Sequence, residues 1–136
     1  MAVVEAAFWQ QISEHPHDVA CRLVYADWLE ERGDPRGEFI RLQCAREEVG
    51  PGPQADALRR RERKLLRQHQ QMWLGRLNRG NAQVKFRGGM IEEVSVSPWA
   101  FNHLMDDLER VAPVLQGLRI TNANGSMNQA VKRLAD

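Results

Sequence analysis

Residues Leu23 to Gln43 read LVYADWLEERGDPRGEFIRLQ, the stretch with the densest structural signals in the chain. Its first half predicts a helix because apolar residues recur there at helical spacing. These residues are Leu23, Val24, Trp28 and Leu29. Gly33 follows them, where a helix commonly ends with a left-handed backbone that glycine adopts without strain. Asp34 and Pro35 predict a new helix start, since the carboxylate can accept free N–H groups and proline fits the first helical position. The stretch therefore predicts two helices joined at a one-glycine corner.

The charged groups around this corner fit two interpretations. As a recognition patch, the paired Arg and carboxylate groups would favour bidentate partners. As a structural network, they would cap the helices and set the angle between them, which is the interpretation that we favour. The residues of this corner cluster are Tyr25, Asp27, Arg32, Asp34, Arg36 and Glu38.

Length and composition are those of an ordinary globular protein. The 136 residues fit one domain, and the fractions of hydrophobic (43%) and charged (27%) residues are typical of soluble chains. No apolar run approaches the roughly 20 residues of a membrane span, and the N-terminus lacks the positive region of a signal peptide. Cys21 and Cys44 are expected to be reduced thiols. We therefore expect a cytoplasmic protein without membrane contact.

The formal net charge of +1 hides an asymmetry along the chain. Residues 1–53 carry five Arg against ten Asp and Glu, whereas residues 54–80 carry eight Lys and Arg against two acids. Residues 81–136 are balanced at six and six. An acidic first segment is therefore followed by a basic one.

The first half of the chain is expected to be helical throughout. The predicted helices span residues 3–14, 19–32, 35–49 and 54–77. Asp18 is a suitable N-cap for the second of them, and the Gly-Pro-Gly-Pro sequence at 50–53 is a clear break. In the long helix Leu58, Leu65 and Met72 recur every seven residues, which predicts an apolar packing seam on one side. Beside this series stand Leu66, Trp73 and Leu77.

The other side of the long helix is strongly basic. It carries Arg59, Arg60, Arg63, Lys64 and Arg67, with Arg61, Arg76 and Arg79 adding to the charge. A row of such side chains could follow a phosphate backbone or receive an acidic partner. We favour a solvated or internally paired face, and keep nucleic-acid binding and docking of an acidic partner as alternatives.

Beyond residue 80 the apolar period changes from 3.6 to 2, which predicts strands. Val84 and Phe86 alternate with basic residues, Gly88-Gly89 turns the chain, and a second strand contains Val94 and Val96. The remaining predicted elements are a helix from Pro98 to Val111, a short strand over 115–120 and a final helix over 127–134.

This second half contains an internal period. Ile91, Val94 and Val96 have the spacing apolar-x-x-apolar-x-apolar, and Leu115, Leu118 and Ile120 repeat it 24 residues later. A strand plus a helix at this interval is typical of leucine-rich repeats, although two copies are fewer than the three that usually suffice for stability. An ordinary β-β-α-β arrangement is the alternative. Where a third strand would be due the chain stops, so an exposed strand edge would allow dimerisation.

Three stretches resemble one known family. Residues 22–43, RLVYADWLEERGDPRGEFIRLQ, closely resemble the signature of a bacterial repeat-companion domain, which stands N-terminal to leucine-rich-type repeats. FWQQISEHPHD, residues 8–18, is similar to the start of that domain. GGMIEEVSV, residues 88–96, is similar to its first strand, with Met90 where an aromatic residue is common. The resemblance covers most of the chain and implies a helical module leading into repeats, with recognition as its role and no catalytic residues.

Taken together, the sequence predicts an α+β fold. A helical bundle of about four helices over residues 1–80 leads into a β-hairpin and a leucine-rich-repeat-like β/α segment over residues 81–136, in one continuous domain. No nucleophile elbow, phosphate loop or zinc motif is present, so we expect no enzyme activity, metal or cofactor. The expected function is non-catalytic recognition or scaffolding with another protein as partner, and the alternative is nucleic-acid binding through Arg59 to Arg67.

Overall fold

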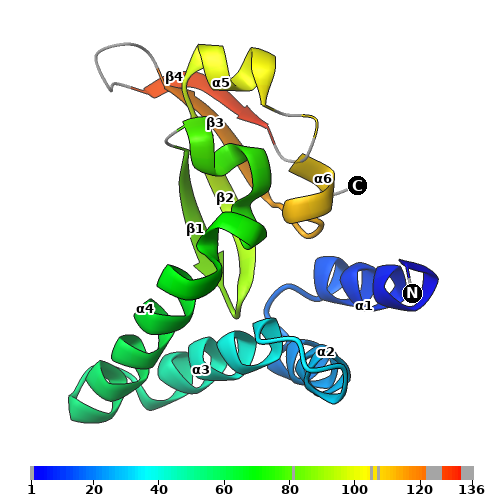
Figure 1. The fold of residues 1–136 in the computed structure, drawn as a ribbon, viewed down its shortest axis with the longest axis vertical. Helices are drawn as coiled ribbons and strands as arrows, with labels where there is room; N and C mark the ends of the chain where they lie inside the picture. Colours follow the sequence, from blue (N-terminus) through cyan, green and yellow to red (C-terminus); the bar gives the residue numbers. More distant parts are fainter. Residues whose placement is uncertain (1, 81, 105, 107, 122–126, 133–136) are drawn as a thin grey trace. The chain divides into compact units, whose positions relative to one another are not determined.

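The computed structural model describes residues 2–80, 82–104, 106, 108–121 and 127–132. It confirms the α+β class, with helices first and a four-stranded sheet after them (Figure 1). The helices are α1 (Ala2–Glu14), α2 (Val19–Glu31), α3 (Arg36–Val49), α4 (Pro53–Leu74), α5 (Pro98–His103) and α6 (Leu108–Val111), and a 3-10 helix η1 (Gly75–Gly80) follows α4. The strands are β1 (Gln83–Arg87), β2 (Met90–Val96), β3 (Gly117–Thr121) and β4 (Met127–Lys132).

The chain divides into two compact units. The first unit comprises Met1–His69 together with Arg87–Met90, the turn between β1 and β2. The second unit comprises Gln70–Phe86 and Ile91–Asp136.

The corner between α2 and α3 forms as its residue types predict. Gly33 has a φ of 71°, and its N–H donates to the carbonyl of Glu30 at 3.0 Å. The next N–H, that of Asp34, donates to the carbonyl of Leu29 at 3.0 Å, which completes the paired bonds of a Schellman motif. Asp34 Oδ1 then accepts the N–H of Arg36 at 2.9 Å, so the carboxylate caps the new helix.

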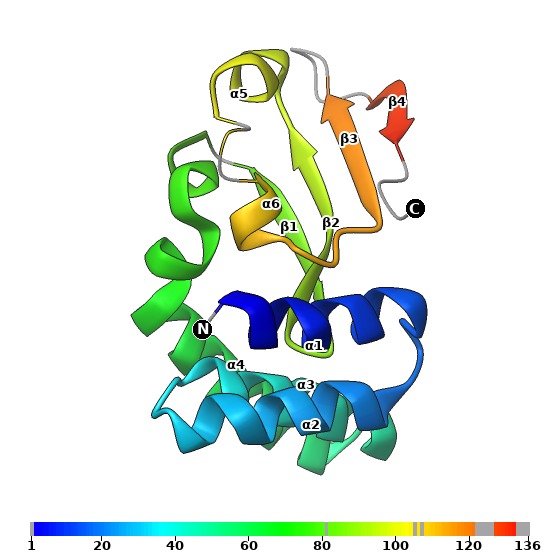
Figure 2. The same ribbon diagram turned by 90° about the vertical axis from the view of Figure 1, so that its right-hand side faces the viewer.

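The core of the first unit lies where α2 packs against α1 and α3 (Figure 2). Gly37 allows α3 to approach α2 closely, because a Cβ at this position would stand 2.7 Å from the carbonyl oxygen of Ala26. Both cysteines are free, and Cys44 is buried. The buried apolar side chains here include Ile12, Ala26, Leu29, Phe39, Ile40, Cys44 and Leu65.

The predicted apolar seam of α4 is only partly right. Leu65 is 3% exposed, but Met72 is 72% exposed. A strict seven-residue repeat drifts by about 20° per heptad around a straight helix, so the third member of the series rotates out of the packed side. Trp73, which the sequence predicts beside this series, is buried.

The sheet has the order β1-β2-β3-β4, and β2 and β3 pair in parallel (Figure 2). Val94 lies opposite Leu118 and Val96 opposite Ile120, so the 24-residue spacing of the sequence is the register of two neighbouring strands. Leucine-rich-repeat character itself stays a prediction.

The helix expected at the end of the chain is wrong. Residues 127–132 form strand β4 rather than a helix, and residues 133–134 of the expected helix lie outside the described residues. Since β4 pairs antiparallel with β3, the sheet edge on this side belongs to β4 and not to β3. The unpaired N–H and C=O groups of a strand edge explain this preference, because a second strand satisfies them and a helix does not. Dimerisation through a strand edge stays a prediction.

The helix expected over 98–111 is divided into α5 and α6. Ser97 caps α5 by accepting the N–H of Ala100 at 3.1 Å, and α5 ends at His103. Arg76 donates to the His103 carbonyl at 3.1 Å, so a tertiary contact replaces a helical bond at this end. The apolar face is retained, since Leu104 and Val111 lie in the core of the second unit. Other members of that core are Leu77, Ile91, Val94, Val96, Leu115 and Leu118.

Candidate functional site

One member of the corner cluster, Arg36, contacts the turn between β1 and β2 within the first unit. Arg36 Nε donates to the carbonyl of Gly89 at 2.8 Å, and Gln43 Oε1 accepts the N–H of the same glycine at 2.7 Å. Arg22 Nη1 donates to the carbonyl of Arg87 at 2.8 Å. Arg22 and Gln43 were absent from the predicted cluster, because their partners lie 65 and 46 residues away in sequence.

Backbone conformation and close contacts favour glycine at both central positions of the turn. Gly88 and Gly89 have φ values of 53° and 81°, as a type I′ hairpin turn requires. A Cβ on Gly88 would stand 2.5 Å from Cδ of Arg22, and one on Gly89 would stand 2.3 Å from Cγ1 of Ile40. The turn therefore lies in direct contact with α2 and α3.

Tyr25 is a buried member of the cluster and connects α2 to α1. Its hydroxyl donates to Glu5 Oε2 at 2.7 Å and accepts the indole N–H of Trp9 at 3.0 Å. Burial and the hydrogen bond to Glu5 raise the pKa of Tyr25. Burial lowers the pKa of the Arg36 guanidinium to about 10, so it stays charged at neutral pH. The Tyr25 hydroxyl and the Arg36 guanidinium are therefore both bonded within the first unit.

The other members of the cluster also have partners within the first unit. Asp27 forms an ion pair with Arg41, and Arg32 lies over the Trp28 ring at 3.9 Å from its centroid. Glu38 accepts from Arg61 on α4 at 2.6 Å, and this bond lowers the pKa of the Glu38 carboxyl. With Asp34 capping α3, all six side chains have an internal role. This arrangement fits the structural interpretation that we favour, and a recognition role for the cluster stays a hypothesis.

A buried carboxylate on α4 completes this network. Glu62 is 4% exposed, and Arg46 Nε donates to its Oε2 at 2.5 Å. Gln43 Nε2 donates to Glu62 Oε1 at 3.1 Å, while its own oxygen accepts from the turn at Gly89. The sequence signal was present, because Glu62 is an acid between Leu58 and Leu65 on the apolar side of the helix.

The basic surface of α4 differs from the corner cluster in having few internal partners. Arg59, Arg60, Arg63, Lys64 and Arg67 are all exposed. Lys64 lies near Glu38, whose pKa it helps to lower. The four arginines make no ion pair or hydrogen bond with any residue that the structure describes. Arg59, Arg63 and Arg67 lie four residues apart, so their side chains project from one side of the helix at steps of about 6 Å.

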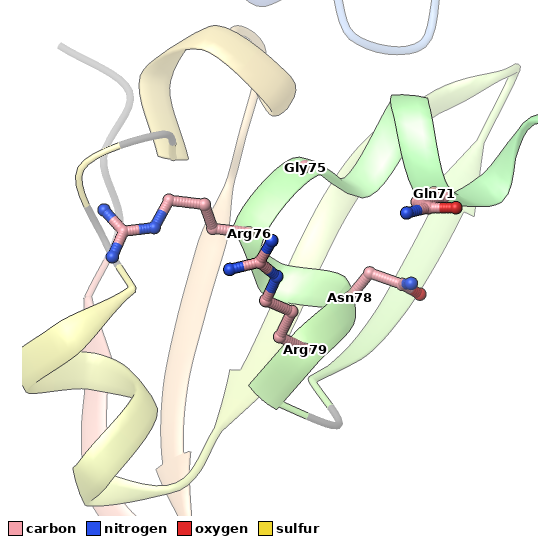
Figure 3. A pocket seen from close by; sticks show the side chains of 5 residues that line it. All are labelled: Gln71, Gly75, Arg76, Asn78 and Arg79. Atoms are coloured by element: carbon pink, nitrogen blue, oxygen red, sulfur yellow. The ribbon is translucent and has the colours of Figure 1, made fainter.

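A polar pocket lies in the second unit around η1. Its volume is about 410 Å³, and Figure 3 shows the five residues that line it. They are Gln71, Gly75, Arg76, Asn78 and Arg79. The sequence marked Arg76 and Arg79 only as an extension of the basic run, because a pocket depends on how η1 turns after α4.

Two kinds of feature are absent from the described residues. No helix in this part of the chain is long and apolar enough to span a membrane. Among the same residues, no group of three or more His, Cys, Asp and Glu side chains is arranged to hold a metal ion.

Comparison with known proteins adds no relative. No protein-family model matches the chain, and neither the curated proteins nor the solved structures include a match.

Proposed function

We propose that this chain is a non-catalytic protein-recognition module that docks an acidic segment of another protein on the basic surface of α4. One observation carries the proposal: Arg59, Arg60, Arg63 and Arg67 are exposed and unpaired within the described residues, whereas the corner cluster is used internally. Arginine is enriched at protein interfaces because its planar fork matches carboxylates. The resemblance to repeat-companion domains points in the same direction.

A protein partner is favoured over nucleic acid by the balance of charge. The first unit contains twelve Lys and Arg and twelve Asp and Glu, so its net charge is zero, and the sequence pI is about 7.9. Nucleic-acid-binding domains commonly have a pI above about 9 and a broad basic footprint. In the first unit, the Lys and Arg side chains without a described ion pair or hydrogen bond lie on α4, which suits a short acidic segment.

The spacing of the arginines indicates how such a segment would bind. Arg59, Arg63 and Arg67 span about 12 Å along the helix axis, which is the length of about two helical turns. Carboxylates that repeat on one face of a partner helix have the same interval. Because these charges are exposed, they would act mainly on association rate and specificity, with binding that weakens as salt is added.

The proposal is tested by fluorescence anisotropy with labelled octaglutamate, with a DNA duplex titrated in parallel. Arg63→Glu should weaken octaglutamate binding about tenfold, which corresponds to about 1.4 kcal/mol. The matched control is Lys85→Glu, an equal charge change at an exposed position on β1 in the second unit. Binding of the wild type should fall between about 50 and about 200 mM salt.

The outcomes separate the alternatives. Equal losses in the two variants, or no octaglutamate binding, would refute docking on α4. Binding of the duplex without the peptide, lost in Arg63→Glu, would favour the nucleic-acid function instead. A pull-down from the native cell with wild-type and Arg63→Glu baits then identifies the partner as a protein retained by the first bait only.

A further inference from the structure

The pocket around η1 is rich in hydrogen-bond donors. Arg79 is exposed, and its guanidinium makes no ion pair or hydrogen bond with the residues that the structure describes. A guanidinium offers five N–H donors and no acceptor. In Figure 3 the side chains of Arg79, Asn78 and Gln71 project from neighbouring turns of α4 and η1.

The amide of Asn78 is oriented by a neighbour. Gln70 Nε2 donates to Asn78 Oδ1 at 3.3 Å, so the amide oxygen is already occupied. The group that remains available on Asn78 is its NH₂, which only donates. The pocket thus has a second side chain whose free polar group suits an acceptor.

Arg76 lines the pocket, but its guanidinium is bonded to other residues of the second unit. Figure 3 shows its side chain extending away from Arg79. It donates to Asp106 Oδ2 and to the His103 carbonyl, each at 3.1 Å. Arg76 and Asp106 thus form an ion pair, and Arg79 gives the pocket a positive potential.

We propose that this pocket binds the oxyanion group of a small ligand, a phosphate or a carboxylate, with Arg79 as the anchoring residue and Asn78 as an oriented donor. Charge-assisted bonds from guanidinium to either group are stronger than bonds between neutral groups. A volume of about 410 Å³ lies within the range of small-molecule sites, so a ligand with an organic body also fits.

This site is independent of the proposed docking surface. All five lining residues belong to the second unit, whereas Arg59 to Arg67 belong to the first. Failure of one proposal therefore leaves the other intact.

The test is a titration of the isotope-labelled full chain followed by amide chemical shifts. Inorganic phosphate and glutarate are added in separate arms, with sodium chloride adjusted to hold ionic strength constant. The wild type should show saturable shifts centred on residues 75–79. Arg79→Gln should weaken binding about tenfold, and Lys85→Gln, which also removes one positive charge from the second unit, should leave it unchanged.

Each outcome decides the proposal. Saturation by phosphate alone or by glutarate alone supports it and identifies the preferred oxyanion. Asn78→Asp replaces the NH₂ donor by a carboxylate and should also weaken binding relative to the wild type. Its circular dichroism spectrum should match that of the wild type. Shifts that do not saturate, or that are the same in Arg79→Gln and Lys85→Gln, would overturn the proposal, since they would reflect general screening by the added ion.

Discussion

Replacing Gly89 by alanine tests the contact between the hairpin turn and α3. The added Cβ would stand 2.3 Å from Cγ1 and 2.5 Å from Cα of Ile40, and the second of these is a backbone atom that cannot rotate away. Overpacking of this kind costs about 1–3 kcal/mol. The left-handed backbone at φ 81° adds about 1–2 kcal/mol for a residue with a Cβ. Alanine also makes the unfolded chain less flexible than glycine does, which offsets up to about 1 kcal/mol of this destabilisation.

We therefore expect Gly89→Ala to lower the free energy of unfolding by about 2–4 kcal/mol. Gly33→Ala is the matched control, since Gly33 has a similar φ of 71° and nothing within 4 Å of the place that an added Cβ would take. It should cost at most about 1 kcal/mol. Gly88→Ala should fall between them, because its Cβ meets the side chain of Arg22, which can move.

Urea unfolding followed by far-ultraviolet circular dichroism measures all three variants. The signal reports mainly on the first unit, which contains α1, α2, α3 and most of α4. If Gly89→Ala is no more destabilising than Gly33→Ala, the turn does not pack against Ile40 and the reasoning fails. If all three variants cost the same, backbone strain alone explains them and the packing term is absent.

Two further predictions concern Tyr25 on α2 and the apolar side of α4. Tyr25, the only tyrosine of the chain, has a pKa raised by burial and by Glu5, so its phenol should stay protonated above the unfolded value of about 10. Because the folded pKa is the higher one, this contribution to stability is present below about pH 10 and is lost as pH rises, and tyrosinate absorbance should appear together with loss of ellipticity. A titration near pH 10 with the helices intact would contradict the buried assignment. On α4, Leu65→Ala should cost about 2–5 kcal/mol in urea unfolding, whereas Met72→Ala should stay within about 0.5 kcal/mol. If the two substitutions lower the free energy of unfolding equally, the predicted seven-residue packing seam would be supported after all.

Local chemistry was sufficient to predict the corner. Gly33 ends α2 and Asp34 caps α3 because both effects depend on the backbone within a few residues. The same holds for the Gly88-Gly89 turn and for the strand pattern of β2. The register of β2 and β3 was also visible in the sequence, as a 24-residue spacing of apolar positions.

Partners distant in sequence were not predictable in this way. Nothing near Gln43 indicates that its amide would bond both Glu62 and the turn at Gly89. Arg76 donates to the last residue of α5 from 27 residues away, and nothing near either residue indicates this contact. Taken alone, the sequence of residues 127–132 predicts a helix. In the structure these residues form a strand because they pair with the edge of β3.

Propensity, capping and apolar period act over one or two turns, so the order of residues was enough to locate most helices and strands. Which charges are available for a partner depended instead on the folded arrangement. Arg36 and Arg59 are the same residue type in similar helical patterns, but Arg36 donates to Gly89 while Arg59 is exposed on α4 without a described partner. The physical reason is that the pairing of a charge depends on the groups that folding brings within hydrogen-bond distance, and sequence separation does not reveal them.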